Sequence, residues 1–338
     1  MAELKVAVLY NLLERLEKGE EKDFVAEAAI VEEIGAIEEG LRFNGYLSYV
    51  LAVRDEIESV IHWLQKIRPD VVFNLCESIY GDARLEMTIP ALLDLLRIPY
   101  TGSSALTLGL CQDKGKVKDI LTSHGILTPK YKVFDREVGV LKGHLFPMIV
   151  KPLHEDGSLG ISKESVVFSD EDLNRQVRYV IERYRQPALV EEFIEGRELN
   201  VGLMESDGRV EVLPISEIDY SEFPEGIPKI CSYEAKWVQE SPEYQKSKPI
   251  CPAALDWILQ KQVEHLAVRV FKLFGCRDYA RVDMRIGRDG KIYILEVNPN
   301  PDISPPSGMV RAIKAKGMTY AEFIRKVIER AHLRGAKR

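Results

Sequence analysis

The stretch YILEVNPNPDISPPSG, residues 293–308, decides the fold that the sequence predicts. An apolar, β-branched run carries Glu296 and Asn298 two positions apart, and four prolines then follow between residues 299 and 306. Side chains two apart on a strand lie on the same face. The pattern therefore predicts a strand that presents an acid and an amide together and then ends in a stiff loop.

The segment ARVDMRIGRDGKIYILEVN, residues 280–298, predicts a hairpin that turns at its Asp-Gly pair. Arg281 and Asp283 share one face of the first strand, and the turn places them beside Glu296 and Asn298. Mg²⁺ takes few protein oxygens and completes its shell with water and phosphate. Asp283, Glu296 and Asn298 are therefore candidate ligands. The alternative is a solvated polar face, although Asp and Asn are poor strand residues.

A second candidate site lies in MIVKPLHEDGSLGIS, residues 148–162. Lys151 ends a predicted buried strand, and a loop with Gly157, Ser158 and Gly160 follows. The lysine can neutralise phosphate oxygens while glycines let backbone N–H groups approach them. The lysine precedes the glycines, so this is not a GxxxxGK[ST] loop. An ordinary glycine hairpin with a surface lysine is the alternative.

A third candidate site lies in ALVEEFIEGRELNV, residues 188–201. Glu191 and Glu192 end one predicted strand, and Glu198 opens the next. Carboxylates there can accept hydrogen bonds from an adenine amino group and from ribose hydroxyls. Solvated surface acids are the alternative, so this pattern gains weight only beside the other two.

Length and composition limit the classes of protein. A chain of 338 residues holds two or three domains. The net charge of −7, with both signs interspersed, argues against a nucleic-acid-binding face, and no apolar run approaches a membrane span. The first residues lack an export signal. The five cysteines form no CxxC pair and are odd in number, which argues against a zinc site and against a disulfide framework. Because free cysteines are typical of a reducing compartment, we expect a cytoplasmic protein.

The first hundred residues alternate between strand and helix patterns. The predicted strands are 5–10, 46–53 and 70–75, and the predicted helices are 24–43, 55–67 and 84–96. This order predicts an α/β domain whose parallel sheet has helices on both faces. No GxGxxG follows the first strand, which argues against a nicotinamide-dependent oxidoreductase.

The remaining chain mixes hairpins with longer helices. It predicts helices over 103–125, 170–185 and 252–275, a strand over 146–152, a hairpin over 197–218 and a long loop or lid over 219–250. Strands joined as hairpins indicate antiparallel sheets, so this part reads as α+β.

Taken in this order, the motifs resemble the ATP-grasp superfamily, and most closely the D-alanine–D-alanine ligases. The resemblance runs from IPYTGSSALTLGLCQDK to GMTYAEFIRKVIERA and includes VKP, VEEFIEGRELNV, YEAKW, CPA, GCRDYARVDM and ILEVNPNP. It implies an N-terminal Rossmann-like domain followed by a two-lobed ATP-grasp fold. The implied domains are residues 1–102, a central lobe 103–205, and a C-terminal lobe 206–338 with the metal site and the lid.

The resemblance also implies roles for individual residues. Phosphate contacts fall to Lys114, Lys151, Lys236 and the backbone around Ser158, adenine contacts to Glu191 and Ile194, and the ribose contact to Glu198. Asp283, Glu296 and Asn298 hold two Mg²⁺ ions, with Mn²⁺ as a possible substitute. Catalytic roles fall to Arg281, which stabilises the oxyanion of the tetrahedral intermediate, and to Lys236 and Ser158.

The implied activity is an ATP-dependent carboxylate–amine ligase that forms an amide bond through an acyl phosphate and releases ADP and phosphate. Its partners are small, amino-acid-like acids and amines, without nucleic acid or membrane, and the resembled family is commonly dimeric. One alternative is an ATP-grasp ligase for other acids and amines. Another is a non-catalytic nucleotide-binding module, which would have no need of an oxyanion donor such as Arg281.

The sequence departs from the family where the substrates bind. The segment 9–23 lacks the family's Gly-rich loop, and residues 74–87 replace its His-Gly stretch. There Glu77 or Glu86 is a candidate for amine recognition, with a helix-surface role as the alternative. Trp237 replaces a tyrosine after the lid lysine. Ser307 matches a position that receives the second substrate's carboxylate, but Asp302 stands where the family has glycine, which should repel a carboxylate and favour a cationic group.

Overall fold

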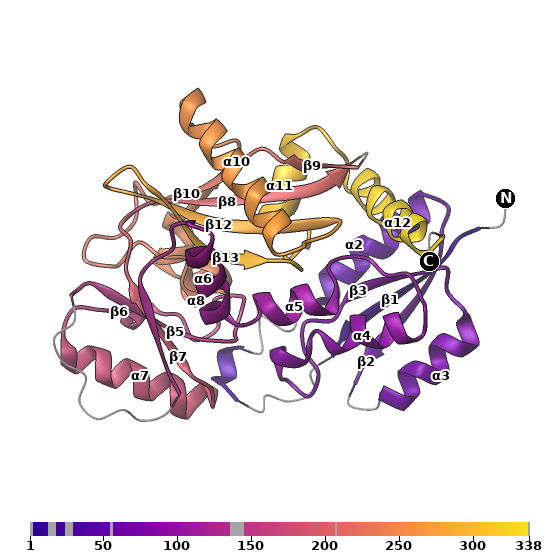
Figure 1. Cartoon of the computed structure of the whole chain (residues 1–338), viewed down its shortest axis with the longest axis horizontal. Helices are drawn as coiled ribbons and strands as arrows, with labels where there is room; N and C mark the ends of the chain where they lie inside the picture. The colour runs from indigo at the N-terminus through magenta and orange to yellow at the C-terminus, as the bar shows by residue number, and fades with distance from the viewer. Residues whose placement is uncertain are drawn as a thin grey trace.

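A computed structural model describes residues 3–12, 18–23, 30–54, 57–135, 145–206 and 208–336. These residues form three sheets: a parallel sheet at the right of Figure 1, a small antiparallel sheet at the lower left, and a larger antiparallel sheet at the upper left. None of the helices in these ranges combines the length and the apolar composition needed to cross a bilayer.

The N-terminal sheet is parallel, in the strand order β2 (Leu47–Val53), β1 (Lys5–Asn11), β3 (Val71–Leu75). Its side chains alternate between two apolar cores. Val6 and Val8 share one core with helix α2 (Ile30–Phe43), while Ala7 and Leu9 share the other with α3 (Ile57–Ile67) and α4 (Thr88–Leu95). The predicted parallel sheet with helices on both faces is confirmed. Residues 24–29 of the first predicted helix lie outside the described residues.

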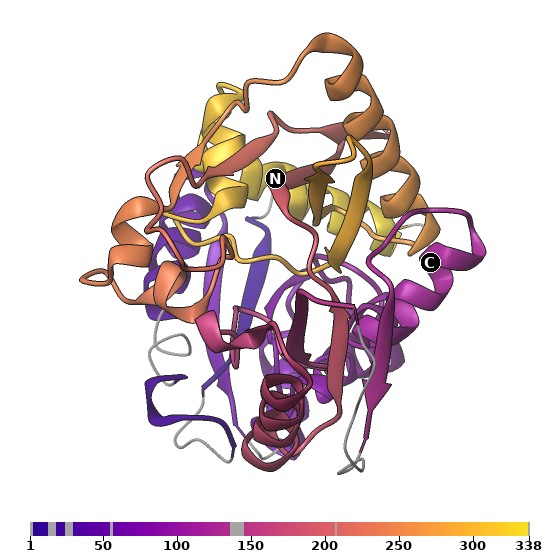
Figure 2. The same cartoon turned by 90° about the vertical axis from the view of Figure 1, so that its left-hand side faces the viewer.

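The small antiparallel sheet follows the strand order β4 (Tyr131–Phe134), β7 (Ala188–Glu192), β5 (Met148–Pro152), β6 (Val166–Val167). Helix α7 (Asp170–Tyr184) packs its apolar side against this sheet through Leu173, Val177 and Val180. In Figure 2 the small sheet lies below the larger one, with α7 at the bottom. The face of the small sheet that α7 does not cover is therefore available for a site between the sheets.

The large sheet follows the order β11 (Lys248–Ile250), β10 (Ser216–Asp219), β8 (Gly196–Ser206), β12 (Tyr279–Gly287), β13 (Ile292–Asn298), and β9 (Arg209–Val212) also pairs with β8. Helix α10 (Trp257–Leu273) covers one face through Val263, Ala267 and Val270. The two predicted hairpins, β8–β9 and β12–β13, are confirmed as antiparallel pairs.

The prediction of one helix over 103–125 is wrong. The structure has α5 (Ala105–Cys111) and α6 (Lys114–Ser123), separated at Asp113. The Asp113 side chain accepts a hydrogen bond from the backbone N–H of Lys116, so it caps a new helix. Because of this break, Lys114 becomes the first residue of α6, and its side chain is buried beside the large sheet's charged residues.

The predicted lid, 219–250, contains the short helices α8 (Tyr233–Trp237) and α9 (Pro242–Lys246) and the edge strand β11. After the proline-rich loop come α11 (Gly308–Ala315) and α12 (Tyr320–Ala336). Three single-turn 3₁₀ helices complete the described secondary structure at Glu21–Asp23, Ala83–Leu85 and Lys163–Ser165. The domain boundaries at residues 102 and 205 stay a prediction.

Candidate active site

The β12–β13 hairpin brings the predicted metal ligands and the predicted oxyanion donor together. Its register pairs Arg281 with Asn298 and Asp283 with Glu296. Arg281 donates from Nε and Nη2 to the two Asp283 oxygens, each at 2.8 Å. The Asn298 amide donates to Asp283 Oδ2 at 3.0 Å and to Glu296 Oε1 at 3.2 Å. Sequence alternation was therefore sufficient to find this cluster.

A fifth member of the cluster, Asn200, was missed by the sequence analysis. It lies on β8 directly opposite Asp283 and donates from Nδ2 to Asp283 Oδ1 at 2.8 Å. The signal was present, because Asn200 follows Glu198 by two positions in an alternating strand and so shares its face. Asn200 helps to fix the orientation of the Asp283 carboxylate.

The two carboxylates of the hairpin differ in their electrostatics. Burial raises the pKa of Asp283, and Arg281 only partly offsets this effect. Burial also disfavours a charged Glu296, but Lys114, the hydrogen bond with Asp283, and Arg281 together outweigh it and lower the pKa of Glu296. Glu296 therefore keeps its negative charge in neutral solution, which is a requirement for a metal ligand.

The donor set fits a magnesium ion. Among the described residues there is no group of three or more His, Cys, Asp and Glu side chains that could hold a metal. Two carboxylates and one amide suffice for Mg²⁺, which keeps water and phosphate oxygens in its shell. The Asn298 amide presents its nitrogen to the carboxylates. A half-turn of that amide would present its oxygen to an ion, so all three ligands are compatible with the prediction.

Two lysines, the buried Lys118 and the partly exposed Lys151, flank Glu191. Lys151 Nζ lies 2.6 Å from Glu191 Oε1, and Lys118 Nζ lies 2.6 Å from Glu191 Oε2. Lys118 was missed, although it follows Lys114 by one helical turn and so shares its face. Both oxygens of Glu191 lie against lysines, so its predicted contact with adenine rests on the family resemblance alone.

Lys114 lies at the start of α6 with its ammonium group buried. Its Nζ donates to the Glu155 carbonyl at 2.5 Å and to Asp156 Oδ1 at 2.9 Å. Burial alone would lower the pKa of Lys114, but Asp156 and Glu296 raise it above its ordinary value. The ammonium group therefore stays charged next to the hairpin carboxylates, where a phosphate-binding residue is expected.

The predicted ribose contact, Glu198, is paired with an arginine that the sequence analysis missed. Arg285 lies opposite Glu198 on β12, and its Nη2 donates to Glu198 Oε2 at 2.6 Å. Its Nη1 donates to the Ile194 carbonyl at 2.8 Å, and Tyr220 donates to the same Glu198 oxygen at 3.1 Å. The R-x-D-x-R alternation of β12 was the available signal. Arg285 thus links two predicted nucleotide contacts.

Helix α8 of the predicted lid is docked on the glycine loop. Trp237 Nε1 donates to the Gly157 carbonyl at 2.9 Å, and Ser158 Oγ donates to the Cys231 carbonyl at 2.8 Å. Lys236 Nζ lies 4.8 Å from the centre of the Trp237 ring. The glycine loop and the lid therefore meet, and the Ser158 hydroxyl is used in that contact.

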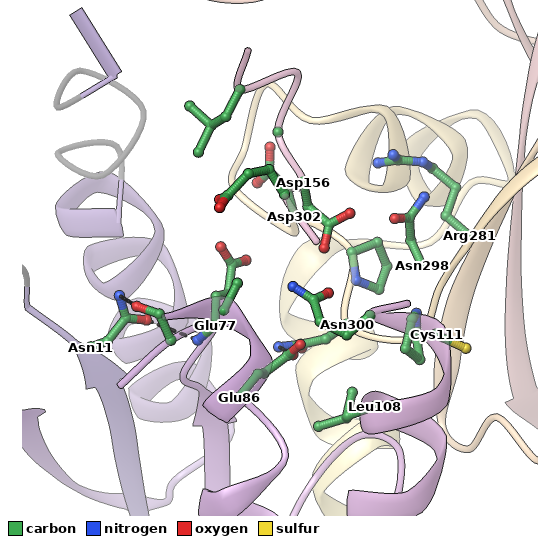
Figure 3. A pocket seen from close by; sticks show the side chains of 18 of the residues that line it. Asn11, Glu77, Glu86, Leu108, Cys111, Asp156, Arg281, Asn298, Asn300 and Asp302 are labelled. Atoms are coloured by element: carbon green, nitrogen blue, oxygen red, sulfur yellow. Dashed lines mark hydrogen bonds between the residues drawn. The ribbon is translucent and has the colours of Figure 1, made fainter. Parts of the chain in front are cut away.

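A cavity of about 150 Å³ opens beside this cluster, between the N-terminal sheet and the large sheet. Figure 3 shows Arg281 and Asn298 on one side of it, and Glu77, Glu86 and Asn11 on the other. Predicted residues on its wall are Lys236, Arg281, Asn298, Asp302, Glu77 and Glu86. Among the described residues, Ser307 is not part of this wall. Its side chain instead caps α11 by accepting from the Val310 N–H at 3.3 Å.

Two antiparallel sheets with lysines and acidic ligands between them define the class as an ATP-grasp fold. The family model described as "D-ala D-ala ligase C-terminus" matches residues 120–329. The D-alanine–D-alanine ligase of Aquifex aeolicus is 33% identical over 297 residues, covering 87% of this chain and 92% of that protein. The chain belongs to the D-alanine–D-alanine ligase family.

Two further proteins are similar to this chain, one in sequence and one in fold. The uncharacterized protein y4sG of Sinorhizobium fredii is 36% identical over 264 residues, covering 78% of this chain and 75% of that protein. The D-alanine–D-alanine ligase from Bacillus anthracis, solved in complex with ATP, superimposes with a TM-score of 0.76 at 23% identity and 99% coverage of both chains. The latter similarity shows the fold.

Proposed function

We propose that this protein joins a carboxylate to an amine at the expense of ATP, with Mg²⁺, through an acyl phosphate and with release of ADP and phosphate. One observation carries the proposal: Arg281, Asp283, Glu296 and Asn298 form a single hydrogen-bonded cluster, and its Arg281 and Asn298 lie on the wall of a cavity. The names of the Aquifex and Bacillus relatives support it, as does the bound ATP of the latter.

The first step needs charge neutralisation, because a carboxylate must attack the negatively charged terminal phosphate. Lys114 and Lys151 are buried or nearly buried cations at this end of the site, and Lys236 lies on the cavity wall. We assign the three lysines to the phosphates. Asp283, Glu296 and Asn298 would hold Mg²⁺, which neutralises phosphate charge when bound.

The second step needs a donor for the oxygen that becomes negative as the amine attacks. Arg281 is held in one orientation because its Nε and Nη2 are bound to Asp283. Among the described residues, none accepts from its Nη1, and the side chain lies on the cavity wall. A fixed donor of this kind is worth about 3–4 kcal/mol in other oxyanion sites. We assign Arg281 to this role.

Water must be kept away from an acyl phosphate, and the lid is the element that we assign to this task. Helix α8 already contacts the glycine loop through Trp237. It also contacts the N-terminal part of the chain, because Lys22 Nζ lies 3.1 Å from Glu234 and 5.1 Å from the centre of the Tyr233 ring. These contacts support a closed lid over the cavity.

The substrates are small and amino-acid-like in the named relatives, and we propose the same size class here. We also propose a cytoplasmic protein and a homodimer, without nucleic acid as a partner. The five cysteines are all free, which supports a reducing compartment. We add three residues to the proposed site because each contacts a side chain that was predicted to bind nucleotide or metal: Lys118 beside Glu191, Asn200 beside Asp283, and Arg285 beside Glu198.

The test is ADP release measured over a panel of acids and amines, with products identified by mass spectrometry. We expect ADP release that depends on both an acid and an amine, and a product whose mass equals their sum minus one water. Nucleotide binding without ADP release across a broad panel would contradict the ligase and favour the non-catalytic module. Hydrolysis of ATP that no amine changes would also contradict it.

A further inference from the structure

Three carboxylates surround the loop that follows β13, and each holds that loop with one oxygen. Glu33 of α2 accepts from the Ile303 N–H at 3.2 Å through Oε1. Glu86 accepts from Asn300 Nδ2 at 3.0 Å, also through Oε1. Asp302 accepts from the Ser304 N–H at 2.8 Å through Oδ1. All three side chains line the cavity, so this wall is acidic.

The second oxygen of each carboxylate accepts no hydrogen bond from the described residues. These oxygens are Glu33 Oε2, Glu86 Oε2 and Asp302 Oδ2. Glu33 and Glu86 are each only 7% exposed, yet no described lysine, arginine or histidine pairs with either. Buried acids are almost always paired. Burial, together with Asp302 near Glu33 and Asp156 near Glu86, raises the pKa of both to about 8 because no cation offsets it.

Arg281 and Lys236 line the cavity, and the charge of Arg281 interacts with that of Asp302, but neither cation pairs with Glu33 or Glu86. Arg281 gives two donors to Asp283, and Lys236 lies over the Trp237 ring. Figure 3 shows Glu86 and Asp302 on the cavity wall away from Arg281, with Asn300 between the two acids. No described lysine, arginine or histidine pairs with Glu33 or Glu86 on this wall, and Ser307 is not among the described residues that line the cavity. The second oxygens of these cavity-lining acids are free to accept hydrogen bonds from a positively charged ligand.

We propose that the amine joined by this protein carries a second positive charge, an ammonium or guanidinium group, which Glu33, Glu86 and Asp302 bind. The inference rests on the proposed ligase function and names the substrate class of its cavity. The reacting amine faces Arg281 and Asn298, while the second cationic group lies against the loop 299–304. A simple amino acid with a free carboxylate at this end would find no cation beside Glu33 or Glu86 to pair with.

The experiment compares three probes by titration calorimetry on the full chain, with and without a non-hydrolysable ATP analogue and Mg²⁺. The probes are 1,4-diaminobutane, which has two charges, butylamine, which has one, and D-alanine. We expect 1,4-diaminobutane to bind about tenfold more tightly than either of the others, as a buried charge pair requires. Equal affinity of the three probes, or tighter binding of D-alanine, overturns the proposal.

Variants locate the binding. Glu86→Gln and Glu33→Gln should each weaken 1,4-diaminobutane about tenfold and leave nucleotide affinity within about twofold. Glu32→Gln is the matched control, because Glu32 is the exposed neighbour of Glu33 on α2. If a variant at buried Glu33 or Glu86 fails to fold, Asp302→Asn, which lies on the partly exposed loop, tests the same loss of diamine binding. Unchanged diamine affinity in Asp302→Asn and in the folded glutamine variants overturns the assignment.

The two proposals fail in different ways. If the chain binds the nucleotide analogue and releases ADP with D-alanine but does not bind 1,4-diaminobutane, the ligase function stands and the proposal of a cationic substrate is wrong. If the chain binds 1,4-diaminobutane but no nucleotide, the ligase function is wrong and the cation-binding cavity stands.

Discussion

The two ends of the cavity are built differently. At the hairpin end, Asp283 is matched by Arg281, and Lys114 supports the charge of Glu296. At the loop end, Glu33 and Glu86 are buried without a cation among the described residues. The hairpin end already carries most of the counter-charge for its own acids, while the loop end lacks it. The first is suited to a metal and phosphates, and the second to a ligand that brings positive charge.

The largest expected effect comes from a substitution at the hairpin end of the cavity. Glu296→Gln should lower ADP release by about a thousandfold or more, because it removes a negative charge from a proposed metal ligand and little volume. The melting temperature should stay close to that of the unaltered chain. Glu211→Gln, on the edge strand β9 of the same sheet, is the control and should be fully active. A Glu296→Gln variant with normal turnover would remove Glu296 from the metal site.

The second prediction concerns the uncompensated acid Glu33. Its pKa of about 8 in the folded chain lies above the ordinary value of 4.5, so the folded state holds a proton that the unfolded state loses. The stabilisation is full below that ordinary value and is lost as pH rises towards 8. Asp302, Tyr279 and Tyr320 face the same carboxyl group.

Glu33→Gln should therefore flatten the pH dependence. Between about pH 5 and pH 8 the variant should lose about 3–4 kcal/mol less unfolding free energy than the unaltered chain. Urea unfolding at several pH values measures this difference. Parallel curves for the two chains would show that Glu33 is ionised in the folded state and already has a counter-charge.

The third prediction concerns the nucleotide side of the hairpin end. Arg285→Met should raise the KM for ATP about tenfold with a smaller change in kcat, because Glu198 and the Ile194 carbonyl lose their shared partner. Arg285→Lys should recover part of the loss. Arg288→Met is the control, because Arg288 pairs with Glu195 at the exposed surface. An equal fall in kcat with KM unchanged would place Arg285 outside nucleotide binding.

The smallest expected effect comes from a substitution at the loop end of the cavity, which tests the preference for the amine. Asp302→Gly should shift the preference from 1,4-diaminobutane towards D-alanine by about fivefold, because it removes the charge that repels a carboxylate. The affinity for nucleotide should stay unchanged. Competition between the two amines for product formation, read by mass spectrometry, measures the shift. An unaltered amine preference would leave Glu33 and Glu86 as the only determinants.

The hairpin end was predictable from the sequence because strand alternation alone fixes which side chains share a face. Arg281, Asp283, Glu296 and Asn298 were found in this way, and Asn200 and Arg285 follow the same rule once their strands are paired. The loop end was not predictable to the same degree. Glu33 meets Ile303 only through tertiary packing of α2 against a distant loop, and no local pattern announces that contact.

Helix boundaries show the same limit. Apolar periodicity runs across Asp113, so one helix was predicted where a capping side chain starts a second one. Helix α11 was not predicted at all, because the prolines before Ser307 mask the short apolar pattern that follows. Caps and breaks depend on single side-chain hydrogen bonds, which composition and period do not reveal.

The C-terminal helix α12 has a consequence for how this chain is synthesised. Phe323, Ile324 and Val327 complete the apolar core that Val6 and Phe73 begin. Helix α2 is therefore left to cover this apolar face of the parallel sheet without α12 until α12 has been synthesised. We expect nascent chains to depend on chaperones over this interval, and fragments that stop before residue 320 to precipitate.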